Sequence, residues 1–298
     1  AGGTTMIVER ALTLAATAGV IGACLFRWSV VQPVANRGAS TGEVDRVVAG
    51  AGLAAALVLA LVVPFRIMTQ AALFATPGDA LMPLMGRVLE TTWGRAAGAQ
   101  GMAAAVAAVG FAGARGLKRW GWRLATRTAL VLAIVPAWMG HAAATESWPK
   151  VAIGADILHV AAAGGWAGGV IILAIVVRSL MAQADGGALA GALIAQFRTP
   201  ALASAGVLLA TGAATTLLRL RTPADFLGTP YGLMLFRKLV VIGAAMALGW
   251  RHSRTASQRA TASGARAVAG SIAVEALLFV AVFALTAVLA GSPPPGSE

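Results

Sequence analysis

The sequence predicts an all-α polytopic membrane protein, a single bundle of eight transmembrane helices. Three observations predict this class: 58% of the residues are hydrophobic, only 11% are charged, and apolar runs fill the 298 residues from end to end. Soluble proteins carry about 25% charged residues, so a chain with a mean hydropathy of +0.80 is not expected to be soluble. The runs also lack the alternating pattern that a membrane β-barrel requires.

Each predicted span is a run of the roughly 20 mostly apolar residues that a helix needs to cross a bilayer. No separate soluble domain fits between the runs, so we expect residues 1–298 to form one transmembrane domain. Thr229-Pro230 is typical of a helix start, with a capping residue followed by proline. In chain order, the predicted spans are 9–31, 47–69, 92–113, 124–143, 154–177, 200–218, 230–250 and 268–291.

Basic residues in the connections predict the orientation, because cytoplasmic loops are enriched in Lys and Arg. If the odd-numbered connections face the cytoplasm, that side holds thirteen basic and three acidic residues, and the other side holds seven of each. We therefore expect both termini on the outer face. These loops also explain the net charge of +12, so we expect no nucleic-acid partner.

Polar residues at membrane depth are costly and are therefore candidate functional residues. His141 ends the fourth predicted span and His159 opens the fifth, so a helical hairpin can bring both to the outer face. Asp156 shares a helix face with His159, and Trp166 follows on the same stripe. The glycine-rich segment 164–169 is expected to let these two spans converge. Such a group suits copper, zinc or iron; the alternative is two unrelated interfacial histidines.

Two more charged residues fall within predicted spans. Glu275 lies in the last span and Lys238 in the seventh, at depths that a lysine side chain can bridge. The pair predicts either a structural ion pair or a proton or cation step below the outer site. The sequence leaves both interpretations open.

Sulfur ligands offer a second candidate metal site. Met82 and Met85 lie in the connection between the second and third spans, and two thioethers suit Cu(I). The alternative is an interfacial apolar turn with incidental methionines. The single cysteine, Cys24, excludes an internal disulfide or a multi-thiolate site. No nucleophile–base pair, phosphate loop or zinc-protease motif appears, so we expect no enzyme activity.

Short motifs follow one another along most of the chain. They are Thr92-Trp93-Gly94, Gly140-His141-Ala142, Asp156-x-x-His159, Trp166-x-Gly168-Gly169, Gln196-Phe197-Arg198, Thr229-Pro230-Tyr231-Gly232, Lys238 and Glu275-Ala276. In order and spacing, these motifs resemble those of the CopD copper-resistance family of bacterial inner-membrane proteins. The sequence departs from the family at Gln196, which stands in place of an arginine, and at Thr13, where some relatives carry a histidine.

The resemblance implies a multi-pass inner-membrane protein that takes copper at its periplasmic face and delivers it across the lipid bilayer. It also implies a periplasmic copper-binding partner of the CopC type. His141 and His159 match the family's histidines, and Asp156, Trp166, Lys238 and Glu275 its accessory positions. Two alternatives stay open: a b-type haem protein with both histidines as axial ligands, and a scaffold for cuproprotein assembly without copper flux. The direction of transport and the oxidation state of copper are open as well.

Overall fold

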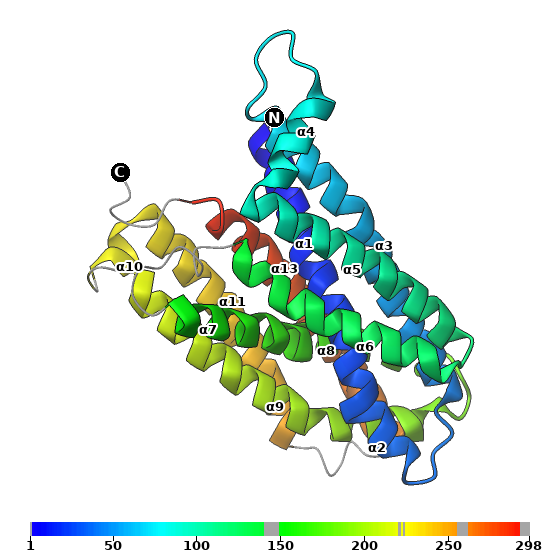
Figure 1. The fold of residues 1–298 in the computed structure, drawn as a ribbon. Helices are drawn as coiled ribbons and strands as arrows, with labels where there is room; N and C mark the ends of the chain where they lie inside the picture. Colours follow the sequence, from blue (N-terminus) through cyan, green and yellow to red (C-terminus); the bar gives the residue numbers. More distant parts are fainter. Residues whose placement is uncertain (1, 140–148, 220–221, 223, 255–261, 293–298) are drawn as a thin grey trace.

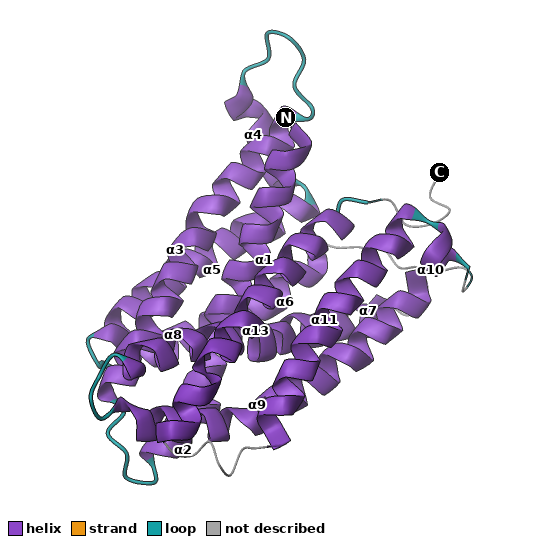
Figure 2. Ribbon diagram, turned by 180° about the vertical axis from the view of Figure 1, so that it is seen from behind, coloured by secondary structure: helices purple, strands orange, loops and turns teal. Residues whose placement is uncertain are grey.

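In the computed structural model, long helices joined by loops make up the described part of the chain, which contains no strand (Figure 1, Figure 2). The structure describes all residues except 1, 140–148, 220–221, 223, 255–261 and 293–298. The predicted all-α class is confirmed. Seven described helices are long and apolar enough to cross a membrane: Gly3–Ala35, Gly42–Ala72, Thr92–Arg115, Lys150–Met181, Gly186–Leu217, Pro230–Arg251 and Ser263–Leu289.

Two of these helices contain a π-helical segment, so each of the two comprises more than one element. The segments η1 and η4 are π-helical, and η2 is a 3-10 turn. The elements are α1 (Gly2–Phe26), η1 (Arg27–Val31), α2 (Gln32–Ala35), α3 (Gly42–Ala72), α4 (Leu81–Glu90), α5 (Thr92–Arg115), α6 (Arg119–Ile134), η2 (Val135–Trp138), α7 (Pro149–Ala163), η4 (Gly164–Gly168), α8 (Gly169–Met181), α9 (Gly186–Arg219), α10 (Asp225–Gly228), α11 (Pro230–Arg254) and α13 (Ala262–Leu289).

The fourth predicted span, 124–143, differs most from the others. Its α-helical part, α6, ends at Ile134 and has only 16 residues, and the chain continues as the 3-10 turn η2. Pro136 explains this end, because proline lacks an N–H and clashes with the preceding helical turn. The last residues of the predicted span lie outside the described residues.

The sixth predicted span begins too late. The sequence places its start at Pro200, yet α9 begins at Gly186 and continues through the proline. Pro200 removes one backbone donor without ending the helix, and the apolar residues before it, such as Leu193 and Phe197, are buried. Packing therefore outweighs the local preference of proline in this helix.

The core lies around α1, which crosses the middle of the bundle (Figure 1). This helix packs against α3 and α6 of the N-terminal half, and against η4, α8 and α13 of the second half. Val20, Ala23 and Phe26 are therefore almost completely buried. α1 connects the two halves of the chain.

The first and last helices share one end of the bundle. The Arg10 guanidinium near the start of α1 lies against Gly291, just after the end of α13. The loop between α3 and α4 projects beyond the same end (Figure 1). At the start of α11, Thr229 accepts a hydrogen bond from the Gly232 N–H at 3.0 Å, which confirms the predicted cap before Pro230.

Candidate functional site

His159 is held by a hydrogen bond between two neighbouring helices. It lies in α7 with Asp156, three residues apart, and both side chains are half-buried. The Nδ1 atom of His159 lies 2.8 Å from the Oγ1 atom of Thr211 in α9. Sequence reasoning missed Thr211, because a single threonine in an apolar span has no local signal that pairs it with a residue 52 positions earlier.

The other hydrogen bond of this threonine favours one tautomer of His159. Thr211 Oγ1 donates its hydrogen to the Val207 carbonyl oxygen at 2.7 Å. A hydroxyl has one hydrogen, so toward His159 it acts as the acceptor. In the neutral imidazole, Nδ1 then carries the proton and Nε2 keeps its lone pair. Metal-binding histidines are oriented by such a bond from their other ring nitrogen.

The other predicted ligands extend this site only in part. His141 lies outside the described residues, so its pairing with His159 stays a prediction. The turn η2, which ends three residues before His141, packs against α7. Within the described ranges, no group of three or more His, Cys, Asp or Glu side chains is arranged to hold a metal ion. Asp156 therefore also remains a predicted ligand.

The glycine-rich segment 164–169 packs against α1 and α9, so the expectation that it joins the fourth and fifth spans is wrong. A Cβ atom on Gly168 would overlap the Ala18 carbonyl oxygen of α1, and Cβ atoms on Gly165 and Gly169 would overlap side chains of α9. Successive helical residues point about 100° apart, so the two glycine stripes face two different helices. The close crossing with α1 requires glycine at positions 164 and 168.

Replacing Gly168 with alanine is expected to destabilise the protein by about 2–3 kcal/mol, because a methyl group has no room against a backbone oxygen. The matched control is Gly154→Ala in α7, where nothing lies within 4 Å of the added Cβ. Alanine favours the helix, so this variant should be as stable as the wild type. Thermal unfolding in detergent compares the two; equal melting temperatures would show that the crossing tolerates a side chain.

Trp166 faces a different helix from His159. The side chain is buried, and its ring packs edge-on against Phe279 of α13 with 4.9 Å between the centroids. The π turn η4 contains Trp166 and follows α7, which contains His159. Their place on one common stripe stays a prediction.

Glu275 and Lys238 occupy different levels of the bundle. Glu275 lies near the middle of α13 and is only 4% exposed. Its Oε1 atom lies 3.4 Å from where a Cβ on Gly249 would stand. Lys238 is eleven residues before Gly249 in α11, or about 16 Å along the helix axis, which is more than a lysine side chain spans. The expected ion pair between the two does not fit this spacing.

Met82 and Met85 lie in the short helix α4 and have different surroundings. Met82 is 76% exposed, whereas Met85 is half-buried against the core. Leu84 and Val88, four residues apart, bury one face of the helix. The amphipathic pattern explains α4 without a metal, in line with the interfacial alternative.

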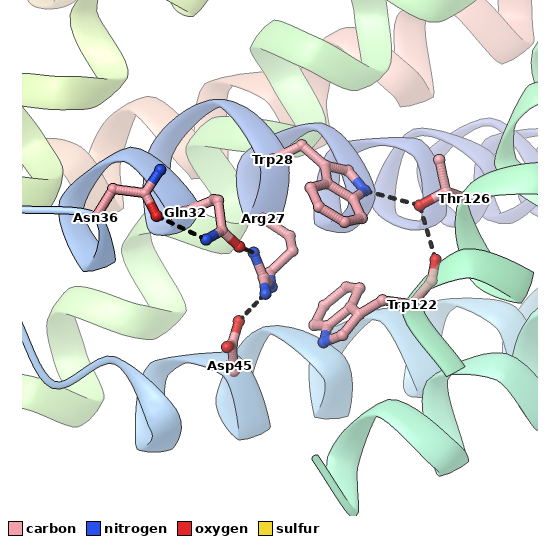
Figure 3. Close-up of polar contacts among 7 residues, drawn as sticks. All are labelled: Arg27, Trp28, Gln32, Asn36, Asp45, Trp122 and Thr126. Atoms are coloured by element: carbon pink, nitrogen blue, oxygen red, sulfur yellow. Dashed lines mark hydrogen bonds and ion pairs between the residues drawn. The ribbon is translucent and has the colours of Figure 1, made fainter. Parts of the chain in front are cut away.

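Sequence reasoning also missed a polar cluster around η1, whose side chains are shown in Figure 3. Arg27 lies near the end of the first predicted span, 9–31, and belongs to η1, inside the first crossing helix. Its Nε atom lies 2.6 Å from the Oδ1 atom of Asp45 in α3, and both side chains are about 15% exposed. The guanidinium also donates to Gln32 and lies over the ring of Trp122, 5.4 Å from its centroid. This ion pair ties the first two spans and α6 together.

A stripe of buried polar side chains also runs along α1. Glu9, Thr13 and Thr17 are four residues apart and are all buried. The hydroxyl of Thr69 in α3 donates to Glu9 at 2.9 Å, and the Gln100 amide of α5 donates to Thr17 at 3.4 Å. Thr13, which stands where some relatives carry a histidine, donates to the Glu9 carbonyl oxygen within its own helix. The stripe links the first three spans.

Comparison with known proteins locates the family of the chain. A family model described as "Copper resistance protein D-like, N-terminal domain" matches residues 3–151, half of the chain, and "Copper resistance protein D" matches residues 191–289. Asp156, His159 and Trp166 lie between the two matches. The comparisons with curated proteins and with solved structures found no match. With both matches in the order that the sequence motifs predicted, the chain belongs to the copper resistance protein D family.

Proposed function

We propose that this protein carries copper across the bacterial inner membrane, from the periplasmic face inward, as a transporter and not as an enzyme. The observation that supports this most is the hydrogen bond from His159 Nδ1 to Thr211, in a chain of a copper-resistance family. In the neutral ring with its proton on Nδ1, Nε2 is the atom that binds a metal. Imidazole binds both Cu(I) and Cu(II).

The proposed outer site comprises His141, His159 and Asp156. The carboxylate, one helical turn before His159, either ligates copper directly or balances its charge. A periplasmic copper-binding protein of the CopC type is the proposed donor. All residues of the chain form one transmembrane domain in this proposal, although two family models match its two ends.

The proposal requires eight crossings with both termini in the periplasm. The contact between Arg10 and Gly291 supports an even number of crossings, because it joins the first and last helices at one end. The segment α6–η2 then supplies the fourth crossing, between α5 and α7, both of which it contacts. The excess of basic residues in the odd-numbered connections supports the direction.

Single cysteines test this topology. In intact cells, Ser292→Cys is expected to react with an impermeant thiol reagent, whereas Ser263→Cys is expected to be shielded until the membrane is permeabilised. The native Cys24 is buried and gives little background. The opposite labelling pattern would move His159 to the cytoplasmic face and contradict the proposal.

Thr211→Val is expected to weaken copper binding by about 10- to 100-fold, the usual effect of losing the hydrogen bond behind a metal-binding histidine. Valine has nearly the same shape but no oxygen to accept the Nδ1 proton. Thr211→Ser keeps the acceptor and should bind copper like the wild type. Copper titration of the purified variants gives the dissociation constants; equal values for the valine and wild-type proteins would exclude Thr211 from the site.

Copper flux into proteoliposomes, with and without reductant, separates transport from scaffolding. A transporter moves copper inward at a rate that saturates, whereas a scaffold binds copper or a partner without flux.

The absorption spectrum addresses the haem alternative. A Soret band that disappears in His141→Ala would show that the protein binds haem and would contradict copper transport. We expect flux and no Soret band.

A further inference from the structure

A cavity of about 340 Å³ lies in the second half of the bundle. Its lining comes from η4, α8, α9, α11 and α13, and most of the lining side chains are apolar. Trp166, Leu173 and Ile272 belong to its inner wall and are at most 5% exposed. Apolar walls with a small number of polar groups are typical of a site that binds a largely apolar molecule.

The cavity opens between α9 and α11. Both helices pack against α13, but among the described residues they pack little against each other. Leu202 of α9 and Trp250 of α11 line the cavity, and their side chains are 48% and 57% exposed. Because α9 and α11 are both long and apolar enough to cross a membrane, we expect this opening to face the lipid bilayer.

A cation lies at the opening. Arg198 stands one helical turn before Leu202 in α9, lines the cavity and is exposed. Basic side chains in pockets between membrane-spanning helices bind the phosphates of anionic lipid headgroups. The carboxylate of the lining, Glu275, is 4% exposed and already has an interaction partner. The opening therefore presents a positive charge beside an apolar pocket.

The position of Trp250 matches the level of the lipid headgroups. This residue lies near the C-terminal end of α11, and exposed indoles are enriched where a membrane meets water. Arg198 lies in the first half of α9. In the proposed orientation, the start of α9 and the end of α11 both face the cytoplasm, so the lipid would come from the cytoplasmic leaflet.

We infer that this cavity binds an anionic phospholipid of the cytoplasmic leaflet, with one acyl chain between α9 and α11 and the phosphate at Arg198. The acyl chain suits the apolar wall, and the phosphate complements the guanidinium. A lipid in this place would fill the gap between two helices that pack little against each other. The site is separate from the proposed outer copper site and does not depend on copper transport.

The test is lipid binding to the full-length protein, delipidated in detergent and observed by native mass spectrometry. The wild type is expected to retain one phosphatidylglycerol and to bind it more tightly than phosphatidylcholine with the same acyl chains. Arg198→Gln should weaken phosphatidylglycerol binding about five-fold, the usual effect of one basic residue near anionic lipid. The matched control is Arg123→Gln, because Arg123 is exposed in α6 and does not line the cavity. It should bind like the wild type.

A second pair of variants tests the acyl-chain pocket. Ala201 is half-buried and lines the cavity, whereas Ala203 is exposed on the same helix and lies outside the lining. Ala201→Phe fills the pocket and is expected to lose the retained lipid, and Ala203→Phe is expected to keep it. Thermal unfolding in the same detergent shows whether both variants are folded.

Three results would overturn the lipid site. They are equal affinity of the wild type for both lipids, phosphatidylglycerol binding by Arg198→Gln that equals the wild type, and phosphatidylglycerol retained by folded Ala201→Phe. A retained apolar molecule without phosphate, such as a quinone, that Ala201→Phe releases would overturn the phospholipid as the occupant. Because these measurements contain no copper, each of these results would leave the proposed copper transport intact.

Discussion

His159→Ala is expected to abolish stoichiometric copper binding at the outer site, and His141→Ala is expected to do the same. The reason is that two imidazoles supply most of the ligands in the proposed outer site, and the contact of Nδ1 of His159 with Thr211 favours binding through Nε2. Copper binding should also weaken as the pH falls through the range in which imidazole becomes protonated, because the protonated ring cannot ligate a metal. Metal analysis after gel filtration at several pH values measures both effects.

The control is His252→Ala, because this third histidine lies near the C-terminal end of α11, among basic residues and away from the proposed outer site. It should retain the copper content of the wild type. If His141→Ala and His159→Ala both keep wild-type copper at neutral pH, the outer site is misassigned. Met82 and Met85 would then be the next candidates.

Asp45→Asn is expected to destabilise the protein by about 3 kcal/mol. It leaves the Arg27 guanidinium without its counter-charge in a site that is only about 15% exposed, and an uncompensated buried charge is costly. Arg27→Met/Asp45→Leu removes both charges and should recover most of the lost stability. Chemical or thermal unfolding in detergent compares these two variants, and the single variants Arg27→Met and Asp45→Leu, with the wild type.

Asp185→Asn is the matched control, since this carboxylate is exposed in a loop at the same end of the bundle. Its stability should stay within about 0.5 kcal/mol of the wild type. If the double variant loses as much stability as the sum of its single variants, Arg27 and Asp45 act independently, and the ion pair does not hold the first two spans together.

The sequence predicted the crossing helices well because a crossing helix needs a long apolar run, and such a run is a local property. It misjudged the helices at prolines, where local preference and packing compete. Pro200 lies inside α9, whereas Pro136 ends α6. Both prolines have the same local chemistry, so the sequence around them did not distinguish the two outcomes.

The candidate site was predictable only where its signals were local. Asp156 and His159 are three residues apart on one helix, and the spacing alone placed them on one face. The partner of His159 is Thr211, and the partner of Arg27 is Asp45. These contacts depend on how helices pack, which the spacing of residues within one helix does not reveal. The contact of Trp166 with Phe279 of α13 likewise joins two distant helices.

Copper uptake into proteoliposomes by the wild type and by His159→Ala, reconstituted at equal density, tests most directly whether copper crosses this protein by way of His159. The account predicts saturable uptake by the wild type and by Thr211→Ser, and uptake at the level of empty liposomes for His159→Ala. Equal uptake by His159→Ala and the wild type would contradict the account, because copper would then cross without the residue that is proposed to receive it.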